Sequence, residues 1–135
     1  MKKKHYRDYA VEAYRFWAAS GGLDAFQKRI AAMFTRSPTV KKAQFTGAIE
    51  DLLAVERSLE ILSHMKNRAD IVRAIRIVYC ADAQRRPGRS DIQARIHYAE
   101  LTIPASEAAI YRWLRLARDT FAEQRGLHLM DAGQL

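Results

Sequence analysis

The sequence predicts an all-α protein of roughly five or six helices that ends in a trihelical helix-turn-helix unit. Apolar residues recur at three- and four-residue spacing along most of the chain, which is the period of a helix. Proline and glycine are few, three and six of 135 residues, so long irregular segments are not expected. A hydrophobic content of 49% at this length is enough for a true hydrophobic core.

Two helices are expected in the first quarter of the chain. The first covers residues 5–20 and is ended by the glycine pair at 21–22. The second covers residues 23–34 and breaks at residues 35–38, because the residue before a proline resists the α region.

Residues 40–64 form the longest helical pattern. Its apolar stripe spans nearly three heptads and consists of Phe45, Ala48, Leu52, Val55, Leu59 and Leu62. The outer face is predicted to be acidic and solvated, and therefore away from DNA; it carries Glu50, Asp51, Glu56 and Glu60. Two arrangements of the stripe are open: pairing with a second copy in a homodimer, or antiparallel packing on the first helix of the same chain.

Two shorter helices follow. The first is expected over residues 69–83, with Asn67 or Asp70 as N-cap. A basic turn at residues 84–90 leads to a helix over residues 91–101, capped by Ser90 or Asp91. Its inward side chains are predicted to be Ile92, Ile96 and either Ala99 or Tyr98. The turn at residues 102–104 then leads to the last helix.

The last helix is the most strongly specified element. Ser106 is its expected N-cap, Glu107 favours the positive end of the helix dipole, and Gly126 is the expected C′ residue. The buried stripe is predicted to contain Ile110, Trp113, Leu114, Ala117 and Phe121. The opposite face is predicted to carry Ala108, Tyr111, Arg112, Arg115 and Asp119.

The predicted domains follow from this order of elements. Residues 1–65 would form a helical interaction module, residues 66–127 a helix-turn-helix DNA-binding domain, and residues 128–135 a frayed tail.

The formal net charge of +8 favours a polyanionic partner, with double-stranded DNA before an anionic membrane surface. No apolar run approaches the ~18 residues needed to span a bilayer, so no membrane partner is expected. Cys80 is the only cysteine and cannot form an intramolecular disulfide, which fits a reducing, cytoplasmic location.

The residues that carry most enzyme chemistry are missing. The four histidines, His5, His64, His97 and His128, have no cysteine or carboxylate at ligand spacing. There is no glycine-rich phosphate loop and no nucleophile motif. We therefore expect no enzyme activity, no metal and no cofactor.

The run IPASEAAIYRWLRLAR resembles the end of region four of bacterial sigma factors. Ile103, Ser106, Ile110, Arg112, Leu114, Ala117 and Arg118 occupy the matching places. It is also similar to phage late-gene regulators of the RinA and ArpU type. With its opening HYRDYAVEAYRF, the whole chain resembles short prophage proteins of Gram-positive bacteria.

The resemblance implies a sequence-specific transcription regulator of phage origin, with the helix at 106–125 in the major groove of DNA. Base-facing residues would be Glu107, Ala108, Tyr111, Arg112 and Arg115, with Arg118 on the same helix. Ser106 and the amides of its turn would meet a phosphate. Arg85, Arg86, Arg89 and Arg95 would contact the DNA backbone.

Two other functions fit the same pattern. A small terminase subunit uses a similar module to mark phage DNA for packaging. A helical adaptor would instead bind another protein, such as RNA polymerase, which region four of sigma factors also contacts.

Overall fold

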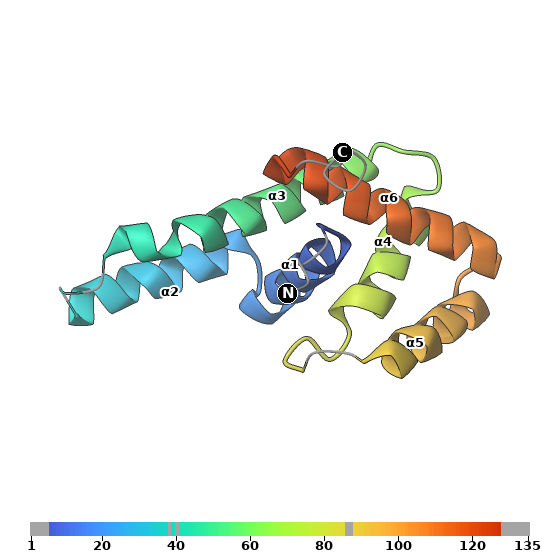
Figure 1. Ribbon diagram of the computed structural model, residues 1–135, viewed down its shortest axis with the longest axis horizontal. Helices are drawn as coiled ribbons and strands as arrows, with labels where there is room; N and C mark the ends of the chain where they lie inside the picture. Colours follow the sequence, from blue (N-terminus) through green and yellow to red (C-terminus); the bar gives the residue numbers. More distant parts are fainter. Residues whose placement is uncertain (1–5, 38, 40, 86–87, 128–135) are drawn as a thin grey trace, which may run out of the picture.

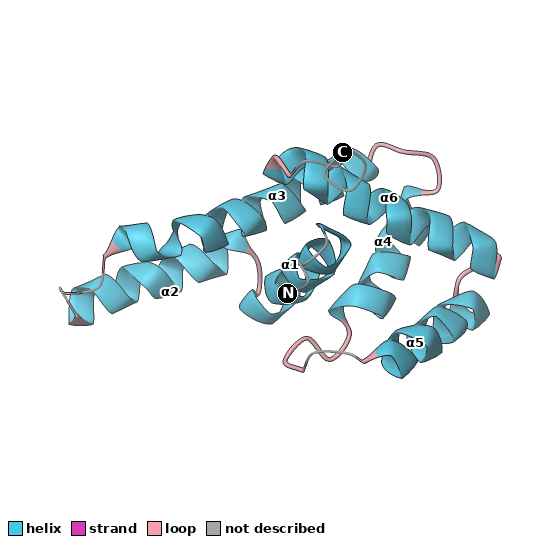
Figure 2. Ribbon diagram, viewed as in Figure 1, coloured by secondary structure: helices cyan, strands magenta, loops and turns pink. Residues whose placement is uncertain are grey.

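The computed structural model describes residues 6–37, 39, 41–85 and 88–127. Within these residues the chain forms six α-helices and no strand, so the prediction of an all-α fold is confirmed (Figures 1 and 2). The elements are α1 (Tyr6–Ser20), α2 (Leu23–Arg36), the 3₁₀ turn η1 (Lys42–Phe45), α3 (Thr46–Leu62), α4 (Arg68–Ile75), the π-helical segment η2 (Arg76–Cys80), α5 (Arg89–Thr102) and α6 (Glu107–Arg125). The predicted tail at 128–135 lies outside the described residues.

Helix α6 lies along the end of α3 and continues past α4 to α5 (Figure 1). It packs against α3, α4, α1 and α5, while α2 packs against α3 and α1. In Figure 1, α2 and the first turns of α3 lie side by side and extend away from the other helices. No described helix combines the length and the apolar character that crossing a bilayer requires.

One hydrophobic core joins the two predicted halves of the chain. Its members come from α1, α3, α4, η2, α5, the turn after α5, and α6: Ala10, Ala13, Tyr14, Ala54, Val55, Leu62, Ile71, Ala74, Ile75, Val78, Tyr79, Ile96, Ala99, Ile103, Ile110, Leu114, Ala117 and Phe121. The predicted boundary between residues 65 and 66 therefore does not separate two cores.

The heptad stripe of α3 is covered within the chain. Leu52, Val55 and Leu62 are fully buried, and α3 packs against α6 and α1. Of the two arrangements open from the sequence, packing in the same chain is the one observed. The other three members of the stripe, Phe45, Ala48 and Leu59, remain partly exposed.

The expectation of a solvated acidic face on α3 is wrong for Asp51 and Glu56, which are only partly exposed, whereas Glu50 and Glu60 are exposed as expected. Asp51 Oδ1 accepts hydrogen bonds from the Tyr9 hydroxyl at 2.8 Å and from Arg125 Nε at 2.7 Å. Arg125 also pairs with Glu50 at 3.2 Å. These contacts connect α1, α3 and the end of α6, so the carboxylate of Asp51 stabilises the packing of three helices.

Glu56 holds the corner between α1 and α2. Its Oε2 accepts from the indole of Trp17 at 3.1 Å and from the amide of Leu23 at 2.8 Å. The second contact satisfies an N–H at the start of α2 that has no partner inside the helix. The corner itself needs left-handed backbone, with φ of +80° at Gly21 and +102° at Gly22.

The predicted helix over residues 69–83 is divided in the structure. Helix α4 ends at Ile75 and continues as the π-helical η2 to Cys80. Asn67, one of the two predicted caps, is the N-cap residue of α4, but it is left-handed with φ of 65° and its side chain makes no capping hydrogen bond. At the other end of the predicted helix, the carbonyls of Val78 and Ala83 accept hydrogen bonds from arginine side chains of α5 and α1.

Helix α5 begins earlier than residue 91. Gly88 is the N-cap, and the Asp91 carboxylate accepts a hydrogen bond from the Gly88 amide at 2.9 Å. Asp91 thus acts from within the first turn instead of preceding it. Of the two alternatives for the inward position, Ala99 is buried and Tyr98 is exposed.

Candidate nucleic-acid interface

The start and end of α6 are formed as the sequence predicts. The Ser106 hydroxyl accepts a hydrogen bond from the Ala109 amide at 3.1 Å, which is an N-cap. Gly126 ends the helix in the left-handed region with φ of 82°. Four residues, 103–106, connect α5 to α6, a turn of the length found in helix-turn-helix units. Ile103 anchors this turn in the core.

Two tyrosines hold the inner face of α6. The hydroxyl of Tyr14, from α1, donates to the Ala117 carbonyl at 2.8 Å, and that of Tyr79, from η2, lies 3.5 Å from the Leu114 carbonyl. The rings of Tyr14 and Tyr79 stack with centroids 5.8 Å apart. Burial raises the pKa of both hydroxyls, which therefore stay protonated as donors.

The outer face of α6 is open to solvent in its first half. The exposed residues there are Ser106, Glu107, Ala108, Tyr111, Arg112 and Arg115, while Ile110, Leu114 and Ala117 point into the core. The structure thus brings together on one face all of the residues predicted for the first half of this helix. A face with a small residue, an aromatic ring and two guanidinium groups can approach a groove edge closely and donate hydrogen bonds to it.

Arg118 does not belong to this face. Its Nη1 donates to the Tyr79 hydroxyl at 2.8 Å, and its Nε is buried without a hydrogen-bond partner. The guanidinium therefore braces α6 against η2. The sequence pattern alone does not distinguish Arg118 from Arg115, because only the position of Tyr79 turns it inward.

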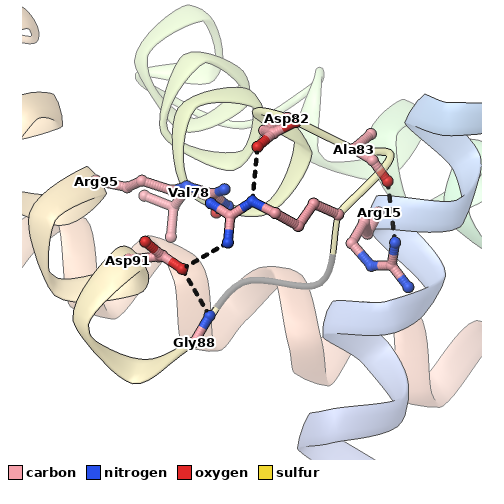
Figure 3. A network of polar contacts seen from close by, with 8 residues as sticks. Arg15, Val78, Asp82, Ala83, Gly88, Asp91 and Arg95 are labelled. Carbon is pink, nitrogen blue, oxygen red and sulfur yellow. Dashed lines mark hydrogen bonds and ion pairs between the residues drawn. The ribbon is translucent and has the colours of Figure 1, made fainter.

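Arg95 is also used inside the fold. Its Nη1 donates to the Val78 carbonyl at 3.0 Å, and Arg15 Nη1 donates to the Ala83 carbonyl at 3.0 Å (Figure 3). A cation at the Val78 carbonyl is favourable because the end of a helix carries partial negative charge, while Ala83 lies in the turn beyond η2. The expectation that Arg95 contacts the DNA backbone is therefore not supported.

Arg85 is exposed but already has two acidic partners. It pairs with Asp82 at 3.0 Å and with Asp91 at 3.3 Å (Figure 3). The Gly88 amide and then Arg85 hold the pKa of Asp91 below its usual range. A phosphate approaching the start of α5 would meet this ionised carboxylate. Arg89 is exposed there, and Arg86 lies outside the described residues.

The described residues contain no cluster suited to a metal ion, in the sense of three or more His, Cys, Asp or Glu side chains grouped together. Cys80 is mostly buried and donates weakly to the Tyr14 carbonyl at 3.8 Å. Burial raises the pKa of its thiol to about 11, so the thiolate is disfavoured at neutral pH.

The chain matches no protein-family model, no curated protein sequence and no solved structure at a significant level. Sequence reasoning missed Tyr14 and Tyr79 as residues that position α6. Both lie on apolar stripes, where the sequence pattern does not distinguish a tyrosine that donates a hydrogen bond from any other buried aromatic residue.

Proposed function

We propose that this protein binds double-stranded DNA and regulates transcription, in the manner of small phage regulators, with α6 in the major groove. The observation that carries the proposal is the exposed first half of α6, where Tyr111, Arg112 and Arg115 lie on one face. The opposite side of the same turns is buried in the core. A recognition helix needs this combination of a free outer face and a fixed inner face.

The chemistry of that face suits base recognition. Arginine can donate two parallel hydrogen bonds to guanine, and a small residue such as Ala108 allows close approach or contact with a thymine methyl group. Rigid support from the Tyr14 and Tyr79 hydroxyls lowers the ordering cost of binding. The formal net charge of +8 adds sequence-independent attraction to phosphates.

The test is selection from a pool of randomised duplexes at two salt concentrations, followed by sequencing. Enrichment of a defined motif supports the proposed function. Salt-sensitive binding without a motif would contradict sequence-specific regulation and indicate packaging or architectural binding. Ring assembly in solution would then favour a small terminase subunit. No binding at low salt contradicts DNA binding; association with RNA polymerase in that case would indicate an adaptor.

A matched pair of variants assigns the binding to α6. The double substitution Arg112→Ala and Arg115→Ala should abolish the selected motif. The control is Arg36→Ala with Arg57→Ala, which removes the same charge from exposed positions on α2 and α3. Equal loss of binding in both variants would mean that net charge, and not the face of α6, carries the affinity.

A further inference from the structure

Tyr111 is the exposed aromatic side chain on the outer face of α6, and the fold does not use it. It is 47% exposed. The hydroxyls of Tyr9, Tyr14 and Tyr79 donate hydrogen bonds within the chain. The side chain of Tyr111 forms no hydrogen bond and no ring contact with any described residue. Its ring is therefore available to a ligand.

Two cations border this ring. Arg112 follows Tyr111 directly, and Arg115 lies four residues after it, which places Arg115 one turn along the same face. Both arginines are exposed, and neither forms an ion pair or a hydrogen bond within the described part of the chain. A single carboxylate, that of the exposed Glu107, lies one turn before Tyr111. The face thus combines an apolar ring with two guanidinium groups that have no acceptor.

The chemistry of this combination limits its ligand. Guanidinium groups favour an anionic partner with paired acceptors, such as DNA. A phosphate backbone alone would suit the arginines but would offer the ring nothing apolar. In the major groove, the apolar group on a base edge is the 5-methyl group of thymine. A cytosine methylated at the same carbon carries the same group in the same place.

Helical spacing limits how far apart the two contacts can lie. Four residues advance about 6 Å along a helix, and successive base pairs are about 3.4 Å apart. A base touched by Tyr111 is therefore within about two base pairs of a guanine touched by Arg115. The hydroxyls of Tyr79 and Tyr14 contact the carbonyls of Leu114 and Ala117, so the turn that carries Arg115 is fixed to the core.

We propose that Tyr111 makes this protein specific for a 5-methylpyrimidine within about two base pairs of a guanine. The ring of Tyr111 contacts the methyl group, and Arg115 donates to the guanine. This role of Tyr111 rests on the proposed DNA binding and names the bases that α6 recognises. Burial of one methyl group changes affinity about fourfold, which is the size of the expected discrimination.

The first experiment uses the motif selected from randomised duplexes and replaces its thymines with uracil, one at a time. Uracil lacks only the methyl group, and the native protein should bind about fourfold more weakly at one of these positions. That position should lie close to the guanine whose replacement no longer matters in Arg115→Ala. The uracil substitution changes only the DNA, so the native protein by itself tests the methyl contact.

Three variants assign the methyl contact to Tyr111. Tyr111→Ala should bind the thymine and uracil duplexes with equal affinity, whereas Tyr111→Phe keeps the ring and should keep the difference of about fourfold. The matched control is Tyr98→Ala, which removes an exposed tyrosine of α5, 58% exposed, and should discriminate like the native chain. Circular dichroism checks that each variant is folded.

Three results overturn the role of Tyr111. One is native protein that binds thymine and uracil duplexes equally at every position, when no methylcytosine contact takes the place of thymine. Another is discrimination that persists in Tyr111→Ala. The third is a Tyr111→Phe variant that loses affinity equally on both duplexes, because the hydroxyl and not the ring would then carry the contact.

A second selection identifies which pyrimidine supplies the methyl group. Its pool carries 5-methylcytosine in place of every cytosine. Thymine near the guanine in the unmodified pool assigns the methyl group to thymine. Cytosine that appears there only in the methylated pool assigns it to 5-methylcytosine, and methylated and unmethylated cytosine then replace thymine and uracil in the titrations. A motif with neither base near the guanine overturns the role of Tyr111.

These experiments separate the role of Tyr111 from the proposed function. Absence of binding to either pool at low salt contradicts DNA binding, and the role of Tyr111 fails with it. A defined motif that is bound without any sensitivity to pyrimidine methyl groups leaves the proposed function standing and overturns the role of Tyr111 alone.

Discussion

Arginine side chains in this chain serve two different purposes. Arg15, Arg95 and Arg118 donate to the Ala83 carbonyl, the Val78 carbonyl and the Tyr79 hydroxyl. Arg112 and Arg115 are exposed on α6. The guanidinium groups of the first set stabilise the fold, because hydrogen bonds from a charged donor contribute about 1.5–3 kcal/mol each. The second group is available to a ligand.

This division predicts different effects for two substitutions on the same helix. Arg112→Ala should weaken binding to the selected DNA by about 1–3 kcal/mol and relax specificity at one base position, while leaving stability unchanged. Arg118→Ala should lower the free energy of unfolding, because it leaves the Tyr79 hydroxyl without its donor. The measurements are DNA titration and urea denaturation of both variants. Equal loss of Arg112→Ala binding on every DNA sequence would refute the base-reading role.

Alkaline pH should destabilise the protein through three buried acids. Burial raises the pKa of Tyr14 and Tyr79 above the ordinary value of 10.0, and that of Cys80 from 9.0 to about 11. Above pH 9 the unfolded chain loses these protons before the folded chain does. The unfolded state then binds fewer protons, so stability is full below pH 9 and falls as pH rises.

The thiol of Cys80 alone should cost about 2 kcal/mol of stability between pH 9 and pH 11, and the two tyrosines add to this loss above pH 10, as measured by urea denaturation. Cys80→Ala should reduce the slope in the lower part of this range. A slope that is identical in native and Cys80→Ala protein would mean that the thiol does not contribute.

At the scale of single residues, the sequence could predict the roles that depend only on the local backbone, such as helix caps. Ser106 and Gly126 act as caps because only the backbone of their own turn is involved. Arg95 and Arg118 could not be predicted, since their hydrogen-bond acceptors lie on other elements. The roles of Asp51 and Glu56 were missed for the same reason.

Helix boundaries show the same limit at the scale of elements. Helix α6 was predicted well because its apolar stripe and both caps agree. The π-helical η2 was not, because the Val78 carbonyl within it accepts from Arg95 of α5, and the Ala83 carbonyl, in the turn beyond it, accepts from Arg15 of α1. A segment stabilised by side chains from other helices leaves no local pattern in its own residues.

Two glycines at helix starts should respond in opposite ways to alanine. At Gly22, φ is +102°, and a Cβ would lie 3.3 Å from Glu56 Oε2, so Gly22→Ala should destabilise the chain by at least about 1 kcal/mol. At Gly47, in the first turn of α3, a Cβ meets nothing within 4 Å. Gly47→Ala should therefore stabilise by about 0.5 kcal/mol.

Thermal and urea denaturation of both glycine variants measure the difference. The two variants serve as controls for each other, since each adds one methyl group near a helix start. Destabilisation by Gly47→Ala would show that the first turn of α3 is tighter than described.

At the scale of the whole molecule, the shared core decides how the chain unfolds. Tyr14, Val55 and Leu62 from the first half are buried with Ile110 and Phe121 from the second. The fold class could be predicted because helical periodicity is local. The single core could not, because the contacts between α6 and α3 join residues far apart in sequence.

The shared core predicts that neither half folds alone. A fragment of residues 66–135 loses the partners of α6 on α1 and α3 and should give the spectrum of an unfolded or molten chain. The full chain should unfold in one transition with the same midpoint by circular dichroism and by tryptophan fluorescence. A fragment with dispersed amide resonances would instead establish an autonomous C-terminal domain.

The internal use of arginine also limits how many counterions DNA binding can release. Each neutralised phosphate contributes about −0.9 to the slope of log K against log salt. Arg95 and Arg118 are engaged in the fold, and Arg85 is paired with two aspartates. Among the described residues of α5 and α6, the arginines that can contact DNA are therefore Arg89, Arg112 and Arg115.

Three cations limit this slope to about −3 at most, less steep than the net charge suggests. Filter-binding or anisotropy titrations across a salt series measure this slope, and one steeper than about −5 would contradict it. Affinity should then fall only about 40-fold over a fourfold rise in salt. Such a protein would discriminate among DNA sequences by its few base contacts, with little of its binding energy supplied by the polyelectrolyte character of DNA.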